Sequence, residues 1–531
     1  MAGEKVSNDE GPTEYLEKVA LDGSGRDFVP PSAAEESAVI RKLDWHLLPL
    51  VFVLYSLSVL DRSNLGNAKL AGMTKDINLT GNRYNWLGTL FYIACKSLSD
   101  RLSLYFFYSE AERSATDILF QWTIIGWKHF SPHRWAAVVV FFWGFVATIQ
   151  ATTSNWGGLM TCRFFLGVAE AMFGPGVPLY LSYFYPRENV GFRHGIFISG
   201  AAMANAYGSA LAYGISQIRG GVAPWKILFI IEGVPTCLIA IITWFFLPDS
   251  LLAARFLNER EKAVAAHFVA RNQKVEEGSE KSGIRFRELF EAFKDPKSMS
   301  SNPTIPTYLK LTPSPGYIPG IMYFSCNVSF ASLPLFVPTI ISEMGSFSQI
   351  QSNGLSAPPY LLCFFTIIIL SFLSDRFRMR GPFCAFAALV AAIGFILQAT
   401  TKSVASRYFG VFLSVNIFAS VALLLAWTAN LHATESKRAG GYTILSTIGQ
   451  CGPLLGTNVF PASEKPYYHK GMWISCAFCL LVTVLSVALS LHLVRENRKM
   501  ERAGLLVPQG SEIADAPSNG EFTERKIRYI Y

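Results

Sequence analysis

The sequence predicts an all-α integral membrane protein with about twelve membrane-spanning helices. Apolar residues make up 51% of the 531 positions and charged residues only 16%, and the charges gather between long apolar runs. Four runs are almost free of charge and long enough to cross a bilayer as a helix: 135–153, 225–247, 382–400 and 472–493. Lipid admits only helices or closed barrels, and the alternating pattern of barrel strands is missing. The spans are therefore expected to be helical.

The spans fall into two groups of six. The first group is predicted at 46–66, 84–127 with an interruption, 135–153, 156–178, 193–216 and 225–247. The second is predicted at 317–341, 355–373, 382–400, 407–430, 440–461 and 471–493. We therefore expect two six-helix bundles, at 45–247 and 317–494, joined by a cytoplasmic linker at 248–316 that contains a surface helix. The polar ends, 1–44 and 495–531, are predicted to be cytoplasmic tails, the first of them disordered.

The basic residues predict the orientation of the spans. Groups of Lys and Arg, such as Arg41, Lys128, Arg376 and Arg495, fall on the same side of the spans as both termini. The positive-inside rule places that side in the cytoplasm, and it explains the net charge of +8 without a nucleic-acid partner. On the opposite side, Asn78-Leu79-Thr80 is an acceptor sequence for N-glycosylation.

A few ionisable residues lie inside the predicted spans, where an ionised side chain costs at least ~3 kcal/mol unless it is paired or faces water. Asp61 and Arg62 lie toward the outer end of the first span, Arg163 and Glu170 in the fourth, and Glu232 in the sixth. Each could be a structural ion pair or part of a proton or substrate path.

Arg163 is the leading candidate for binding a carboxylate, because a guanidinium stays charged and can bind both oxygens. The alternative is that it only braces Glu170 or Glu232. Burial raises the pKa of a carboxyl group and a neighbouring arginine lowers it, so these two acids are candidates for proton exchange. Structural pairing is an equal alternative for Glu232.

Three uncharged polar residues within spans, Asn205, Asn327 and Tyr360, could hydrogen-bond a substrate in a central cavity. Ordinary packing between helices is the alternative for each of them. No prosthetic group or metal is expected.

Several motifs resemble those of known carriers. The segment 374–381, which contains Asp375, Arg376 and Arg380, resembles the gating signature of the major facilitator superfamily. The corresponding first-half segment, 126–135, keeps the basic residues but lacks the Asp. The segments 60–68, 163–171, 352–360, 436–438 and 448–456 are similar to the fungal anion:cation symporter family, which includes allantoate, nicotinate and pantothenate permeases.

This resemblance implies the major facilitator fold, with two bundles related by pseudo-two-fold symmetry. It also implies a monomeric, proton-coupled carrier of a small organic anion, such as nicotinate, another vitamin or a ureide, in the plasma membrane. A related carrier of a secondary metabolite and a non-transporting nutrient sensor remain as alternatives. An enzyme is not expected, since no helical metal-ligand set or nucleotide loop is found among the spans.

Two segments do not fit a carrier, and we interpret both as translated introns. Residues 96–117 place seven charged residues in the middle of the second span, although the apolar flanks, 84–95 and 118–127, would together form one span. Residues 299–316 are a Pro, Ser and Thr-rich insertion before the seventh span. Codons for the residues at both borders can contain splice-donor and splice-acceptor sequences.

We predict that the mature message lacks both segments. Reverse transcription and sequencing across the two borders is expected to yield products that join the flanks of 96–117 and of 299–316. Genomic DNA amplified with the same primers is the control and should retain both. Mature message that keeps both segments would contradict the interpretation.

Overall fold

The computed structural model describes residues 31–105, 130–174, 176–185, 190–218, 220–274, 317–345, 347–431 and 435–502. The regular structure in these ranges is helical, without a strand. The segment 299–316 lies outside the described residues, and 96–117 is described only as far as Tyr105, as helical backbone.

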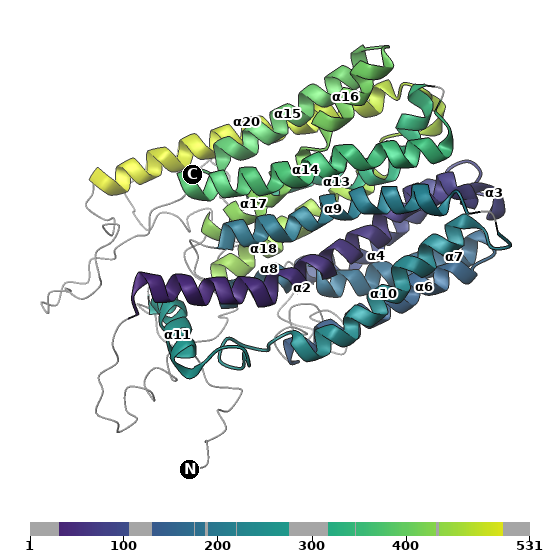
Figure 1. Ribbon diagram of the computed structural model, residues 1–531. Coiled ribbons are helices and arrows are strands. Elements are labelled where there is room, and N and C mark those ends of the chain that lie inside the picture. Colours follow the sequence, from purple (N-terminus) through teal and green to yellow (C-terminus); the bar gives the residue numbers. More distant parts are fainter. Residues whose placement is uncertain are drawn as a thin grey trace, which may run out of the picture.

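The N-terminal half consists mainly of long helices that run back and forth across the bundle (Figure 1). They are α2 (Ala33–Ala68) with its continuation through the π-helix η1 (Lys69–Met73) into α3 (Thr74–Asp76), α4 (Arg83–Tyr105), α6 (Pro132–Ile149) with η2 (Gln150–Thr152), α7 (Trp156–Phe173), α8 (Gly176–Phe184), α9 (Val190–Ile215) and α10 (Pro224–Phe246). The predicted fourth span is thus two helices, α7 and α8, that meet at Gly174.

The C-terminal half repeats this arrangement. Its helices are α13 (Tyr317–Met344), α14 (Gln349–Phe377), α15 (Gly381–Thr400), α16 (Val404–Ser414), α17 (Ile417–Leu431), α18 (Glu435–Gly449), α19 (Gly452–Gly456), the 3-10 turn η4 (Ala462–Glu464) and α20 (His469–Arg502). Two predicted spans are again divided. Pro453, the second residue of α19, lacks the N–H that would continue the preceding helix. The Asn416 amide between α16 and α17 donates to the Phe412 carbonyl at 2.8 Å.

The two halves meet along several pairs of helices. α9 packs along α14 and α17, α2 packs against α13, and α4 packs against α18. The first residues of α2 and the last residues of α20 lie at the same end of the bundle, at the left of Figure 1. We call this end the inner end, because the positive-inside prediction places it in the cytoplasm, and the opposite end the outer end.

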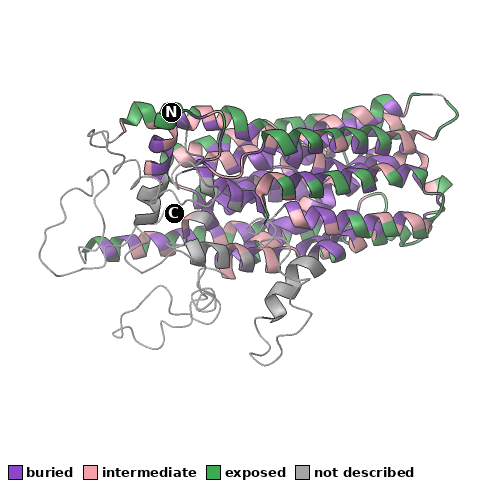
Figure 2. Cartoon of the chain, turned by 90° about the horizontal axis from the view of Figure 1, so that it is seen from below, coloured by how far each residue is buried: buried purple, intermediate pink, exposed green. Residues whose placement is uncertain are grey.

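Apolar side chains cover the outside of the bundle as well as its core. Figure 2 shows exposed residues along the outward faces of the helices and buried residues between them. On α10, for example, Leu238, Phe245 and Phe246 are 58%, 69% and 72% exposed. Eight helices of the described part are long and apolar enough to cross a membrane. Such a surface is stable only in lipid, which makes the chain a multi-pass membrane protein.

The first and last helices reach beyond the predicted bundle boundaries. α2 begins at Ala33 and not near 45, because Ser32 and Glu35 form a capping box in which each side chain accepts a hydrogen bond from the other's backbone N–H. At the other terminus α20 continues to Arg502, beyond the predicted limit of 494.

The linker contains the expected helix, α11 (Glu259–Lys274), and it packs against the inner part of α2. The Lys42 ammonium lies 2.7 Å from a carboxylate oxygen of Glu261, and His46 stacks on Phe256 with ring centroids 4.1 Å apart. Hydrogen bonds from Lys42 hold the pKa of Glu261 below its ordinary value. The carboxylate therefore stays ionised at neutral pH and ties the linker to the first helix.

Close helix packing in the N-terminal half depends on Gly167 of α7. A Cβ atom there would lie 2.5 Å from the Phe91 carbonyl oxygen of α4, whereas a Cβ on Gly214 of α9 would meet nothing within 4 Å. Small residues of this kind let membrane helices approach closely.

We predict that Gly167→Ala destabilises the protein by about 1–3 kcal/mol, since the new methyl group forces α4 and α7 apart. The matched control, Gly214→Ala, should be neutral or slightly stabilising, because alanine favours a helix. Thermal unfolding of the purified protein in detergent measures both. Equal unfolding temperatures for the two variants would contradict the packing argument.

Candidate functional site

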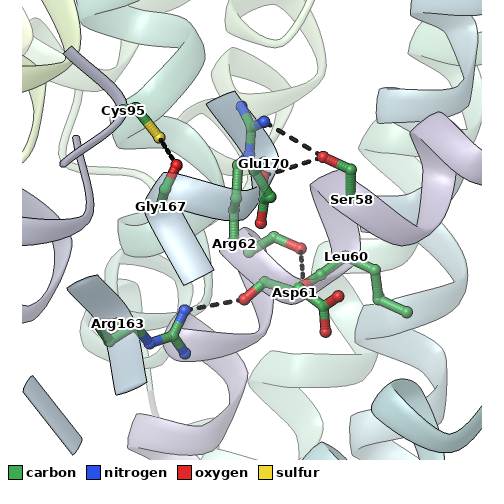
Figure 3. Close-up of polar contacts among 9 residues, drawn as sticks. Ser58, Leu60, Asp61, Arg62, Cys95, Arg163, Gly167 and Glu170 are labelled. Carbon is green, nitrogen blue, oxygen red and sulfur yellow. Dashed lines mark hydrogen bonds and ion pairs between the residues drawn. The ribbon is translucent and has the colours of Figure 1, made fainter. Parts of the chain in front are cut away.

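A cluster of buried polar side chains lies inside the N-terminal half (Figure 3). α2 contributes Ser58 and Arg62 on one face and Asp61 and Asn64 on another, because residues three and four positions apart lie on the same side of a helix. α7 contributes Arg163 and Glu170, and α10 contributes Glu232. Asp61, Arg163, Glu170 and Glu232 are each at most 2% exposed.

Glu170 joins α7 to α2. Its carboxylate accepts hydrogen bonds from the Arg62 Nε and, at 3.0 Å, from the Ser58 hydroxyl. Arg62 also donates to Ser58, at 3.2 Å, so that the three side chains form a closed triangle (Figure 3). The Arg62 side chain is 23% exposed, and its guanidinium lies 5.5 Å from the Phe91 ring centre. Arg62 is thus paired with Glu170 but remains partly exposed.

Arg163 has a different partner from either acid that the sequence suggested. Its Nη1 donates to the backbone carbonyl of Asp61 at 2.9 Å, and its guanidinium lies 5.5 Å from the Phe229 ring centre. Its Nε and Nη2 have no hydrogen-bond partner among the described residues. The alternative that Arg163 braces Glu170 is therefore not realised, because Arg62 occupies that position.

Glu232 lies on the other side of α2. Its carboxylate accepts a hydrogen bond from the Asn64 amide, while its second oxygen has no partner in the described part of the chain. Asn64 in turn receives a hydrogen bond from Asn67 at 3.4 Å.

Asp61 is the least satisfied member of the cluster. Neither of its carboxylate oxygens accepts a hydrogen bond from a described residue, although the Trp143 indole lies beside it. Glu170 and Arg163 of α7 and Glu232 of α10 interact with it electrostatically. Three carboxyl groups thus share a buried cluster with two guanidinium groups, which leaves one negative charge in excess if all are ionised.

Sequence reasoning missed Ser58 and Asn64. The available signal was their position, since Ser58 precedes Arg62 by one helical turn and Asn64 follows Asp61 by nearly one turn. A small polar residue on the same helix face as a buried charge is a candidate partner for it.

The other predicted substrate residues are not joined to Arg163 by a hydrogen bond within the described ranges. The Asn205 amide donates to the Ala201 carbonyl of its own helix at 2.8 Å. Asn327 of α13 donates to the Gly449 carbonyl of α18 at 3.1 Å, so that it holds two helices together. Tyr360 of α14 is 1% exposed, and its hydroxyl has no partner in the described structure.

The residues of the expected gating signature lie at the inner end, on the seam between α14 and α9. Arg380 lies 2.8 Å from Asp375, whose other carboxylate oxygen accepts a hydrogen bond from the Phe192 backbone N–H at 2.7 Å. A Cβ on Gly191 would lie 2.2 Å from an Arg380 nitrogen, so only glycine fits there. Arg376 is exposed. Asp375 and Arg380 thus fasten the C-terminal half to the start of α9.

At the outer end, the halves meet through backbone contacts. The Tyr84 hydroxyl of α4 donates to the Leu335 carbonyl of α13 at 3.1 Å, and a Cβ on Gly66 of α2 would lie 2.7 Å from the Pro334 carbonyl oxygen. Asn78, the predicted glycosylation acceptor, is exposed in the loop after α3 at this end.

A sequence model of the Major Facilitator Superfamily matches residues 51–457. The chain belongs to this superfamily. The expected family and fold class are thereby confirmed, and the protein is a transporter that carries small molecules across a lipid bilayer.

Its curated relatives are fungal members of the superfamily. The high-affinity nicotinic acid transporter of Saccharomyces cerevisiae is 28% identical over 514 residues, which covers 95% of this chain and 87% of that protein. The MFS transporter prlL of Fungal sp. is 30% identical, with 89% of this chain and 90% of that protein covered. The major facilitator-type transporter hxnP of Emericella nidulans is 29% identical, with 88% of each chain covered.

Among solved structures, the proton:xylose symporter XylE of the same superfamily has a TM-score of 0.59 at 14% identity. The match covers 85% of this chain and 95% of XylE. At that identity the likeness concerns the fold alone. It supports the division of this superfamily member into two helical halves.

We predict that the Arg62 and Glu170 charges stabilise the protein only as a pair. Arg62→Gln leaves a buried carboxylate without its cation and should cost about 3 kcal/mol, as should Glu170→Gln for the opposite charge. The double variant removes both charges and should recover most of the loss. Unfolding in detergent measures the cycle, with Arg376→Gln, at the exposed inner surface, as the neutral control. Losses that simply add in the double variant would contradict the pairing.

Proposed function

We propose that the protein is a proton-coupled symporter that imports a small organic anion, a carboxylate such as nicotinate. The observation that carries the proposal is the composition of the buried cluster, in which three carboxyl groups accompany two arginines. Such a cluster can hold one proton and one bound anion without a large net charge in the membrane. Buried ionisable residues in a transporter commonly mark the paths of ions and substrates.

The anion is proposed to bind at Arg62. An arginine binds both oxygens of a carboxylate, and the Arg62 side chain is 23% exposed, whereas Arg163 is 1% exposed as a residue. Phe91 next to the Arg62 guanidinium offers an aromatic surface for the ring of an aromatic acid. Arg163, with two unbonded groups, is the proposed second cation, which becomes available when the helices move.

Protons are proposed to enter through Glu170, Asp61 and Glu232. Glu170 and a substrate carboxylate compete for the same guanidinium of Arg62. A proton on Glu170 weakens its hold on Arg62 and releases the arginine for the anion. Loss of the anion restores the pair and expels the proton, so that the two movements are coupled by charge.

Uncharged polar groups of both halves would complete the substrate site. The unpaired Tyr360 hydroxyl is the proposed hydrogen-bond donor, since it lacks another role in the described structure. Asn205 and Asn327 each donate to a backbone carbonyl, so they contribute to the site through helix position first.

The contact of Asp375 and Arg380 with the start of α9 is the proposed inner gate. Opening the inner end must part this contact, because it joins the two halves. Arg376 is proposed to add positive charge at the cytoplasmic surface. A monomer suffices for this cycle, with Asn78 outside the plasma membrane as a glycosylation site.

The relatives support the substrate class. The Saccharomyces cerevisiae relative is named as a transporter of nicotinic acid, and it matches nearly the whole of this chain. A transporter of a monocarboxylate with a pyridine ring requires a cation beside an aromatic surface, which Arg62 and Phe91 provide.

We predict that cells expressing the cDNA of the mature message take up a labelled monocarboxylate, and that uptake increases as the external pH falls. Lower external pH supplies the driving proton. Arg62→Gln and the charge reversal Arg163→Glu should each abolish uptake, since each removes one of the two arginines on which binding of the carboxylate is proposed to depend. A panel of nicotinate, other vitamins and ureides, measured at several external pH values, provides the test.

The control for these variants is Arg255→Gln, which removes an exposed arginine from the linker. Its uptake should equal that of the wild type, and surface expression should be the same for all forms. Uptake that does not depend on pH would exclude proton coupling, and retained transport by Arg163→Glu would remove Arg163 from the site.

A further inference from the structure

A lysine lies on the seam between the two halves at the outer end. Lys69 follows the last residue of α2, and its ammonium is 4.4 Å from the Tyr84 ring centre and 5.9 Å from that of Phe336. Its closest hydrogen-bond partner is the Thr339 hydroxyl, at 3.4 Å. Tyr84 belongs to the N-terminal half, whereas Phe336 and Thr339 belong to α13 of the C-terminal half.

Lys69 forms no salt bridge with any described residue. Nearby acids at the outer end have other partners. Glu343 lies 2.7 Å from the Lys465 ammonium and accepts a hydrogen bond from the Tyr468 hydroxyl at 2.7 Å. Asp76 accepts a hydrogen bond from the Trp225 indole, also at 2.7 Å. The lysine is thus a cation held by aromatic faces, without an anion of its own.

The contacts around Lys69 cross the seam that an alternating-access carrier has to open. The Tyr84 hydroxyl bonds to the Leu335 carbonyl, and Gly66 packs against Pro334, so the outer ends of the halves are in direct contact. When they separate, Lys69 loses Phe336 and Thr339 but keeps Tyr84, which is on its own half. The ammonium then faces the outer vestibule with one aromatic ring beside it.

Lys69 also lies above Arg62 along the same helical segment, toward the outer end. The two residues are seven positions apart, which is about two helical turns or roughly 10 Å along α2, on nearly the same face. Lys69 begins the π-helical turn η1, in which Gly72 has φ +104°. Turns of this kind are frequent at functional sites in helices.

We propose that Lys69 is an outer binding site for the carboxylate of the substrate, with the Tyr84 ring as its aromatic platform. The anion binds there when the outer end opens and then moves two turns down α2 to Arg62. This inference rests on the proposed function, because it requires a transported organic anion. It adds an outer entry site to the deeper site at Arg62. Lys69 would be the first residue to select substrates that carry a negative charge.

The test compares Lys69→Gln with Lys75→Gln, which removes an exposed lysine from α3 at the same end. Lys69→Gln should raise the KM for labelled nicotinate about tenfold, the effect of one lost charge-assisted hydrogen bond, and should change the maximal rate little. Lys75→Gln should leave both values unchanged. An unchanged KM in Lys69→Gln would overturn the proposal, as would a lower maximal rate at constant KM, because that result indicates a purely structural role for the lysine.

A second variant tests the charge itself. Lys69→Cys, treated from outside with a trimethylammonium-bearing methanethiosulfonate, should regain a KM close to that of the wild type. A sulfonate-bearing reagent should raise the KM further, and wild-type protein treated with both reagents controls for the native cysteines. Equal effects of the two reagents on the KM would overturn the proposal.

The wild-type measurement separates this inference from the proposed function. If wild-type protein at normal surface density takes up no carboxylate of the panel, the proposed function fails and the outer site fails with it. If wild-type protein transports nicotinate and Lys69→Gln transports it with the same KM, only the outer site is wrong.

Discussion

The structure depends above all on how a few ionised side chains are accommodated inside a bundle that is apolar on both its core and its surface. A charge without a partner is costly in this environment, so each buried arginine and acid acts as a fixed point between helices. Glu170 ties α7 to α2 through Arg62 and Ser58, Arg163 ties α7 to α2 through a backbone carbonyl, and Asn64 ties α2 to Glu232 of α10. In the proposed transport cycle, a proton that neutralises one of these acids would disturb a contact between helices.

The two ends of the molecule are closed in different ways. At the inner end the contact is ionic and directional, with Asp375 held between Arg380 and the backbone N–H of Phe192 in the first turn of α9. At the outer end it consists of close backbone packing at Gly66 and of aromatic rings around Lys69. Water or a change in a neighbouring charge weakens an ionic contact. A contact made by close packing is lost only when the two packed surfaces move apart. The two gates are therefore expected to respond to different events in one transport cycle.

Much of the candidate site was predictable from sequence, but the pairing within it was not. Asp61, Arg62, Arg163, Glu170 and Glu232 stand out because they are charged residues in apolar runs. One interpretation of the sequence had Arg163 brace Glu170 or Glu232, yet Glu170 bonds to Arg62, and Arg163 bonds to the Asp61 backbone. Partner choice depends on helix rotation and on the distance between helices, which periodicity within one helix does not contain. Ser58 and Asn64 were not predicted as site residues, because uncharged polar residues are common in membrane helices.

By itself, the sequence predicted about twelve helical spans in two groups of six, and it identified the superfamily, which is confirmed. These follow from composition and length, because lipid requires about 20 apolar residues in every crossing helix. The tertiary structure decided which helices meet on the seam, where α7, α16 and α18 end, and how far α2 and α20 extend beyond the bundle. It also revealed that the Arg62 side chain is partly exposed, whereas Arg163 is buried. Exposure and partnership arise from packing between distant segments, and that is physical information which only the folded chain contains.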